Sequence, residues 1–354
     1  MQVGNAKLPY RLHVGRVLLA TMLLSCAVLT SSAALGNSVG SSAPSAKLGG
    51  RVSLTIPASS HQVYKVSVSA GDWIIGYAWK PGTHTAASTL RILPPSASDV
   101  ASDAVATSTP TGILFYRAPE SGTYFCDFKG APGTAVTRGL FTSRPVLALR
   151  VPSSMVISYA AKTPLGCTFT DPLYKYVHFD GPEVCFEYVS VSSSTDGVTW
   201  KTINGGMTDY NGVWACNVSG TWRKTYFRFD YGGSVYDMAA FGESHSATIT
   251  VIPHSLITQS IPAKAKNNVV FGVRAWLQPR VAAGPTNVTA EAYKKGTSAV
   301  LSFPATAFAS KSGPTPLKAS VTLPSAGTWY VRFHRTSDGV NADSATKWVT
   351  VAVS

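Results

Sequence analysis

Three short runs, each opened by a glycine with an aromatic residue two positions later, constrain the fold of this 354-residue chain most. They are Gly122–Phe128, Gly212–Val218 and Gly327–Phe333, and they continue as alternating or apolar segments typical of strands. Their glycines stand 90 and 115 residues apart. These intervals match small all-β domains better than the roughly 20–50-residue units of solenoids. The sequence therefore predicts an all-β chain of three tandem β-sandwich domains.

The composition supports many short strands rather than helical bundles. Only 13% of the residues are charged, and the chain has 30 Gly and 22 Pro, which favour tight turns. Runs with helical periodicity and caps are nearly absent after residue 35. The length is enough for two or three domains with separate cores.

Residues 1–34 are predicted to be a signal peptide. Lys7, Arg11 and Arg16 give a positive n-region, the following stretch to Leu29 is apolar, and small residues favour cleavage after Ala34. The protein is therefore expected to be exported, either secreted or held at the cell surface, with no transmembrane helix in the mature chain.

An alternative interpretation of the same segment makes Cys26 a lipidation site. Leu23-Leu24-Ser25-Cys26 resembles the lipobox of lipoproteins, although leucine at its second position departs from the usual pattern. An uncleaved anchor is a weaker alternative, because Ser and Thr interrupt the apolar run. Residues 35–47 are rich in Ser, Gly and Ala and are predicted to form a flexible spacer.

The first predicted domain spans residues 48–150. Alternating patterns predict strands over 63–68 and 73–79, and the Ser-, Ala- and Pro-rich stretch 94–111 predicts a mobile surface loop. The turn at Ala70-Gly71-Asp72 and the late strand beginning Ser121-Gly-Thr-Tyr124 resemble the bacterial pre-peptidase C-terminal domain. That resemblance implies a jelly-roll-like sandwich that accompanies secreted enzymes and has no catalytic residues.

The second and third predicted domains span residues 151–253 and 254–354. Asp196-Gly-Val-Thr-Trp200 and Thr225–Phe229 are similar to the Ig-like repeats of actinobacterial surface and secreted proteins. Gly327–His334, followed by Ala345-Thr-Lys-Trp348, resembles another actinobacterial extracellular Ig-like module. Both resemblances imply Ig-like sandwiches.

The net charge of +13 is concentrated at the C-terminal end, where residues 255–354 hold eleven basic and three acidic residues. In an exported protein this excess favours anionic envelope polymers or a membrane surface as neighbours, through screened attraction. A solvated surface with no partner is the alternative. Nucleic acid is not an expected partner, because no arginine-rich stripe or nucleic-acid module accompanies the charge.

Four cysteines remain after the predicted signal peptide. Three of them, Cys167, Cys185 and Cys216, fall in one predicted domain, so a disulfide between two of them is a candidate, with Cys126 left over. Buried free thiols are the alternative for all four. No cofactor is predicted, and no metal site either, since no CxxC or His-rich spacing is present.

Motifs of catalysis are missing from the sequence. No GxSxG, HExxH, P-loop or EF-hand pattern occurs, and no catalytic residue is predicted. Trp200 and Trp222 lie near turns and are candidates for stacking on sugars. Five other tryptophans fall in strand patterns and are expected to fill sandwich cores: Trp73, Trp79, Trp214, Trp276 and Trp329.

These features predict a secreted, noncatalytic scaffold or adhesion protein of the cell envelope, built of Ig-like domains. A polysaccharide-binding accessory protein is the alternative. A secreted hydrolase with an unrecognised site is the third possibility.

Overall fold

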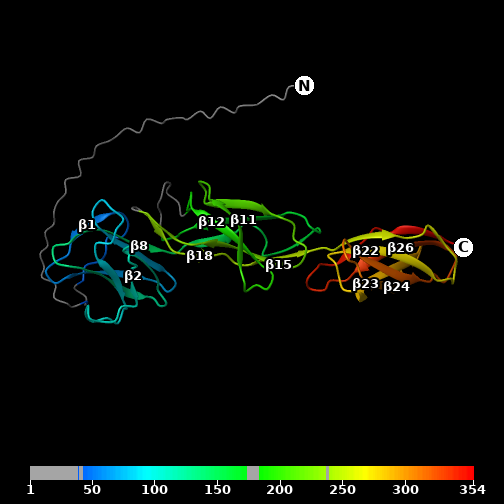
Figure 1. Cartoon of the computed structure of the whole chain (residues 1–354), viewed down its shortest axis with the longest axis horizontal. Coiled ribbons are helices and arrows are strands. Elements are labelled where there is room, and N and C mark those ends of the chain that lie inside the picture. Colours follow the sequence, from blue (N-terminus) through cyan, green and yellow to red (C-terminus); the bar gives the residue numbers. More distant parts are fainter. Residues whose placement is uncertain (1–38, 40–42, 174–182, 237–238) are drawn as a thin grey trace, which may run out of the picture. The chain divides into compact units, whose positions relative to one another are not determined.

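The computed structural model describes residue 39 and residues 43–173, 183–236 and 239–354, and these residues are all-β (Figure 1). The predicted signal peptide and Cys26 lie outside them. Contacts group Asn37–Ser354 as one compact unit, and the division into three domains stays a prediction. We name the strand groups 52–143, 146–253 and 256–353 the N-terminal, middle and C-terminal segments.

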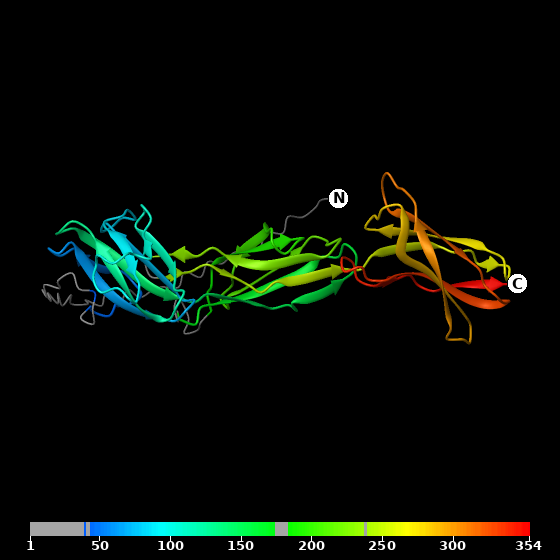
Figure 2. The ribbon, with the colours of Figure 1, turned by 90° about the horizontal axis from the view of Figure 1, so that it is seen from below.

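The N-terminal segment is an eight-stranded sandwich with the strand order of a jelly roll. One sheet has the order β1-β8-β3-β6 and the other β2-β7-β4-β5, and Figure 2 shows them in blue to cyan. The strands are β1 (Val52–Thr55), β2 (His61–Val68), β3 (Trp73–Trp79), β4 (Thr89–Leu93), β5 (Ala106–Thr107), β6 (Ile113–Arg117), β7 (Gly122–Lys129) and β8 (Ala135–Ser143).

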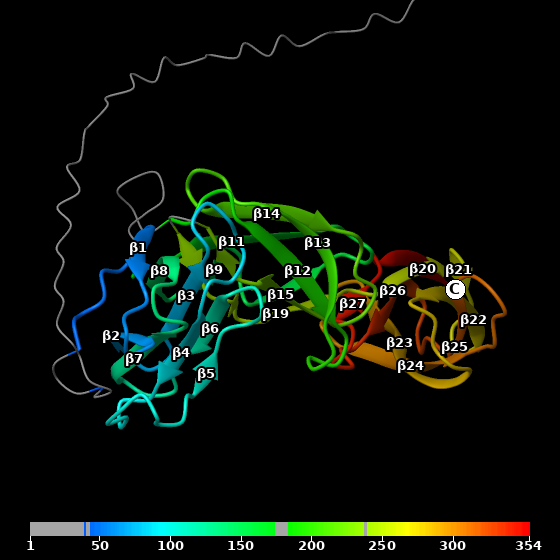
Figure 3. The same ribbon diagram turned by 60° about the vertical axis from the view of Figure 1, so that its left-hand side comes forward.

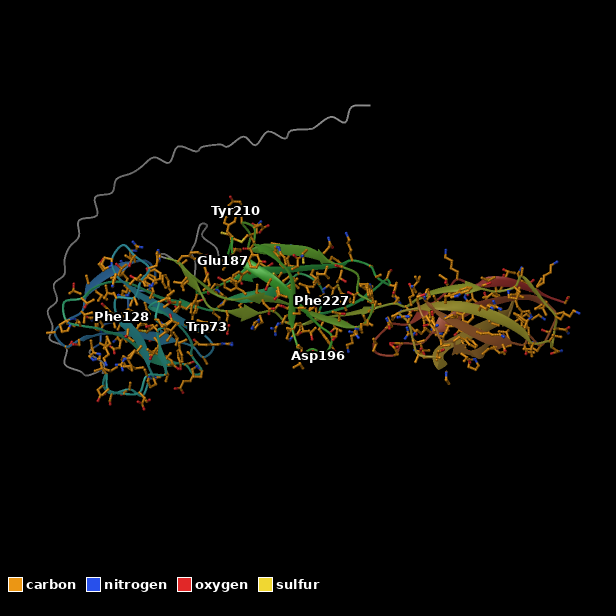
Figure 4. All side chains as sticks on the ribbon, in the orientation of Figure 1. Trp73, Phe128, Glu187, Asp196, Tyr210 and Phe227 are labelled. Carbon is orange, nitrogen blue, oxygen red and sulfur yellow. The ribbon has the colours of Figure 1, made fainter. Side chains whose placement is uncertain are left out.

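The core of this segment encloses a buried arginine. Arg138 lies on β8, with its guanidinium carbon 4.2 Å from the ring centroid of Tyr64 and 5.8 Å from that of Phe128. Phe128 itself is fully buried (Figure 4). Two aromatic faces thus surround a cation that would otherwise be costly to remove from water.

The stretch predicted as a mobile loop is instead packed on the sheet. Val100 is buried against Phe125 of β7, and Arg91 bonds both the carboxylate of Asp127 and the carbonyl of Val100. Residues 106–107 of the same stretch form β5. The described part of the predicted spacer is packed as well, because Val39 and Ala43 join this satellite core. The predictions of a mobile loop and a flexible spacer differ from the structure for the same reason: apolar side chains lie among the Ser and Ala residues and pack on the sheet.

The middle segment follows the strand order of an immunoglobulin-type sandwich. A sheet of order β10-β19-β15-β12-β13 faces a sheet of order β14-β11-β9, as Figure 3 shows. The strands are β9 (Val146–Leu149), β10 (Ser154–Ile157), β11 (Thr163–Thr170), β12 (Tyr188–Ser194), β13 (Lys201–Met207), β14 (Val213–Val218), β15 (Thr225–Tyr231), β16 (Ser234–Val235), β17 (Ala240–Phe241), β18 (Ser244–His245) and β19 (Ile249–Pro253).

The core of the middle segment continues into the N-terminal segment. Trp214 packs edge-on against Phe229, with ring centroids 5.7 Å apart. Tyr77 and Phe141, which lie on β3 and β8, belong to the same buried cluster. Ser143 donates to the buried carboxylate of Asp171 at 2.6 Å. The first two predicted domains therefore share packing across their predicted boundary.

The C-terminal segment is a second immunoglobulin-like sandwich with one continuous ladder. Its order is β20-β22-β25-β24-β23-β26-β28-β21, with β27 added to β26, and the two layers are joined where β24 pairs with both β25 and β23. The strands are β20 (Leu256–Ser260), β21 (Lys264–Ala265), β22 (Phe271–Gln278), β23 (Gly284–Lys294), β24 (Val300–Ala307), β25 (Thr315–Val321), β26 (Gly327–Arg335), β27 (Ser344–Ala345) and β28 (Val349–Val353).

The strands predicted from the three glycine-aromatic runs are confirmed as β7, β14 and β26. Trp79, Trp214 and Trp329 are buried as expected, and Trp73 is partly buried. The expectation for Trp276 is wrong, because its side chain is 37% exposed. Val273, Ala275 and Leu277 point inward from the same strand, so period-two alternation places Trp276 on the outer face.

Within the described ranges, the structure has no helix with the length and apolar character needed to span a bilayer.

Replacing Phe229 with Ala tests the core of the middle segment. The phenyl ring is fully buried against Trp214, so we expect a loss of about 3–5 kcal/mol in the free energy of unfolding. Urea unfolding followed by tryptophan fluorescence measures it. Val198→Ala is the control, because Val198 is 80% exposed and should change stability by about 0.5 kcal/mol or less. Equal effects of the two substitutions would contradict this packing.

Candidate binding groove between the middle and C-terminal segments

A groove of about 780 Å³ lies where the middle and C-terminal segments meet. Its walls come from the loop between β14 and β15, the loop after β22 and the loop between β26 and β27. Its lining includes Ile203, Trp222, Arg223, Arg280 and Val340. It combines an exposed indole, two guanidinium groups and apolar side chains, which is the composition of a ligand site.

Trp222 stands on a loop with a fixed backbone. Gly220 lies so close to Ala160 that an added Cβ would approach the Ala160 carbonyl oxygen to 2.3 Å. Thr221 is buried, and its hydroxyl lies 3.3 Å from that of Thr163. The side chain of Trp222 nevertheless remains 62% exposed. The loop therefore presents the indole without burying it.

The loop between β26 and β27 holds the Trp222 loop from the other side. The Asn341 side-chain amide donates to the carbonyl of Trp222 at 3.1 Å. The backbone N–H of Lys224 donates to the carbonyl of Val340 at 2.7 Å. These two hydrogen bonds, one at the residue before Arg223 and one at the residue after it, attach the Trp222 loop to the C-terminal segment.

A further backbone hydrogen bond joins the two segments close by. The N–H of Ala342 donates to the carbonyl of Pro253, the last residue of β19, at 2.9 Å. The loop between β26 and β27 is therefore bonded to the middle segment at two separate points of the backbone.

The negative charge of Asp338, which lines this groove, is already compensated by a neighbouring cation and by backbone N–H groups. Burial alone would raise the pKa of Asp338, but the backbone N–H groups of Asn341 and Val340 and the nearby Arg335 outweigh it and hold the pKa below its ordinary value. The Arg335 guanidinium lies 2.5 Å from the Asp338 carboxylate and is itself buried. This pair braces the loop between β26 and β27.

Arg223 and Arg280 give the groove its positive charge. Both are exposed, and among the described residues neither forms an ion pair with a carboxylate. Arg280 Nη1 donates to the carbonyl of Lys311 at 3.1 Å, which orients the side chain and leaves its charge uncompensated. Guanidinium groups in such positions suit carboxylate, phosphate or hydroxyl groups of a ligand.

Of the two tryptophans predicted to stack on sugars, only Trp222 lies in the groove. The ring of Trp200 is covered by Arg228, whose guanidinium carbon lies 4.4 Å from the ring centroid. Sequence reasoning did not find Arg223, Arg280 or Asn341, because nothing in their local sequence shows that three loops converge. Asn341 is 119 residues away from Trp222.

The four described cysteines are free thiols. Cys167 faces Trp214 and Cys216 faces Leu165 across β11 and β14, so these two thiols are diagonal neighbours, while Cys185 precedes β12. A disulfide among Cys167, Cys185 and Cys216 stays a prediction. Burial raises the pKa of Cys126 and of Cys167 to about 12, which makes both thiols poor nucleophiles.

Three of the described histidines contact carboxylates rather than nucleophiles. His61 contacts Asp127, His245 contacts Asp230, and His334 contacts Glu291. In the part of the chain that the structure describes, no group of three or more His, Cys, Asp or Glu side chains could hold a metal ion.

A buried carboxylate, Glu187, lies in the middle segment and is not among the residues that line the groove. Tyr231 donates to it at 3.0 Å and Ser234 at 3.3 Å. Burial raises the pKa of Glu187, and these hydroxyl donors only partly oppose the shift. These two hydroxyls satisfy part of the hydrogen-bonding capacity of the buried carboxylate.

Comparisons with known proteins do not assign the chain to a family. No protein-family model matches the sequence, and no curated protein matches it. Among solved structures, red sea bream transglutaminase is similar over 60% of this chain and 31% of its own length, with 12% identity and a TM-score of 0.28. A marsupial T cell receptor is similar over 84% of this chain and 99% of its own, with 9% identity and a TM-score of 0.27. The resemblances found in the sequence stay predictions.

Replacing Glu187 with Gln tests the buried carboxylate. The folded chain holds the Glu187 proton more tightly than the unfolded chain, because its pKa is raised above the ordinary 4.5. Its contribution to stability is therefore present below pH 4.5 and is lost as the pH rises through the raised pKa. Thermal unfolding across this range should show the Tm of the wild type falling relative to that of Glu187→Gln. Parallel curves would show that the pKa is not raised.

Proposed function

We propose that this chain is a secreted, noncatalytic binding protein of the cell envelope, an adhesion or scaffold module that holds a polysaccharide in the groove beside Trp222. The observation that carries the proposal is the exposed indole on a fixed loop. An aromatic ring presented in this way can stack on the apolar face of a sugar ring. Because the backbone is already held by Asn341, little ordering cost is added on binding.

The flanking arginines supply the polar half of the site. Arg223 follows Trp222 directly, and Arg280 enters from the loop after β22. Their N–H groups can donate to sugar hydroxyls, and more strongly to carboxylate or phosphate substituents. The groove therefore fits a glycan with anionic groups better than a purely apolar ligand.

A noncatalytic role is supported by the chemistry of the groove residues. The groove carboxylate, Asp338, accepts hydrogen bonds from Arg335 and two backbone N–H groups, which leaves it a poor general base. Export is supported by the basic and apolar pattern of residues 1–34.

Trp222→Ala is the direct test. We expect the variant to bind purified bacterial cell walls at least about tenfold more weakly than the wild type, because a central tryptophan is typically a binding hot spot. The difference should persist at high salt, since stacking does not depend on charge. Pelleting of the protein with the walls gives the apparent Kd.

Trp200→Ala is the matched control, because it also removes one tryptophan, but one whose ring is covered by Arg228. Its affinity should equal that of the wild type. Unchanged binding by Trp222→Ala would contradict the groove as the site. Release of soluble sugar from the walls by the purified protein would contradict the noncatalytic role.

A further inference from the structure

A second surface of the C-terminal segment has the features of a binding face. It is the outer side of the layer formed by β20, β22, β25 and β24, and we call it the Trp276 face. Trp276 stands on it with 37% of its side chain exposed. In the described part of the chain, no aromatic ring or cation covers the indole in the way that Arg228 covers Trp200 or Arg332 covers Trp348.

Two cations share this face with Trp276. Arg274 lies two residues earlier on β22, so it points to the same side, and in the antiparallel register it is directly opposite Lys318 of β25. Both side chains are exposed. The indole and the two charges are therefore neighbours on one surface, with adjacent strands about 4.8 Å apart.

The rest of the face combines polar residues with the apolar Leu256 and Pro316, and its strands carry no opposing charge. Thr258 is opposite Trp276, Ser260 is opposite Arg274, and Thr306 is opposite Lys318. None of the four strands contains an Asp or a Glu. The positive charge is therefore not neutralised by carboxylates on these strands, which gives complementarity toward an anionic ligand.

We infer that the Trp276 face binds a linear anionic polysaccharide, with a sugar ring stacked on Trp276 and its acidic groups on Arg274 and Lys318. The inference goes beyond the proposed function, because it adds a second site made of different residues. A membrane surface would be drawn to the same charges, but it would not need one indole flanked by hydroxyl groups. The stacking residue therefore favours a glycan.

The test uses the full exported chain and three probes: polygalacturonate as a linear polyuronate, dextran as a neutral polysaccharide, and vesicles containing phosphatidylglycerol. Arg274→Glu/Lys318→Glu and Trp276→Ala should each bind polygalacturonate at least about tenfold more weakly than the wild type. None of the variants should change binding to dextran. Unchanged Tm values exclude misfolding, and the loss in the charge-reversed variant should shrink as salt is added, because the charge contribution is screened.

The matched control is Lys295→Glu/Lys347→Glu, which changes the net charge equally but alters exposed lysines that are not on the four strands of this face. It should keep most of the affinity for polygalacturonate. An equal loss in this control would show diffuse attraction and overturn the inference. Vesicle binding as tight as polygalacturonate binding, with Trp276→Ala unaffected, would assign the face to membranes and also overturn it.

Trp222→Ala separates this site from the groove. If Trp276→Ala still weakens polygalacturonate binding when it is added to the Trp222→Ala variant, the Trp276 face binds the polyanion independently of the groove. If only Trp222→Ala loses affinity, the second site is refuted and the groove stands.

Discussion

Each strand of a β-sandwich has one inward and one outward row of side chains, and this constraint decides what every segment of the chain can do. The inward rows close cores such as the one between Trp214 and Phe229. The outward rows and the loops are then the surfaces left for partners. In the C-terminal segment the inward row of β22 is Val273, Ala275 and Leu277, which leaves Trp276 to face outward.

Contacts between loops form the groove beside Trp222. Asn341 reaches from the C-terminal segment to the Trp222 loop, and the Arg335–Asp338 pair holds the loop on which Asn341 stands. The groove thus depends on hydrogen bonds between residues far apart in the sequence.

Much of the fold could be predicted from local sequence. The glycine-aromatic runs predict β7, β14 and β26, because a turn residue followed by an aromatic strand is a local signal. The outward direction of Trp276 could have been inferred as well. Arg274 lies two residues earlier on the same strand, so both side chains point to the same face of the sheet, and a charged residue favours the solvent face. The groove could not be predicted from the sequence, because it depends on how three loops are placed relative to one another. The sequence does not predict the packing of the loop at Val100, because most residues of that stretch are polar or small and only a few are apolar.

We infer that exposed tryptophans make the glycan contacts, while the buried tryptophans only support the sandwiches. The most direct measurement is an NMR titration with an oligogalacturonate, following the indole N–H resonances of the eight tryptophans. The resonances of Trp222 and Trp276 should shift, and those of Trp79, Trp214 and Trp329 should not. Shifts confined to the buried tryptophans, or no shift at saturating ligand, would contradict this inference.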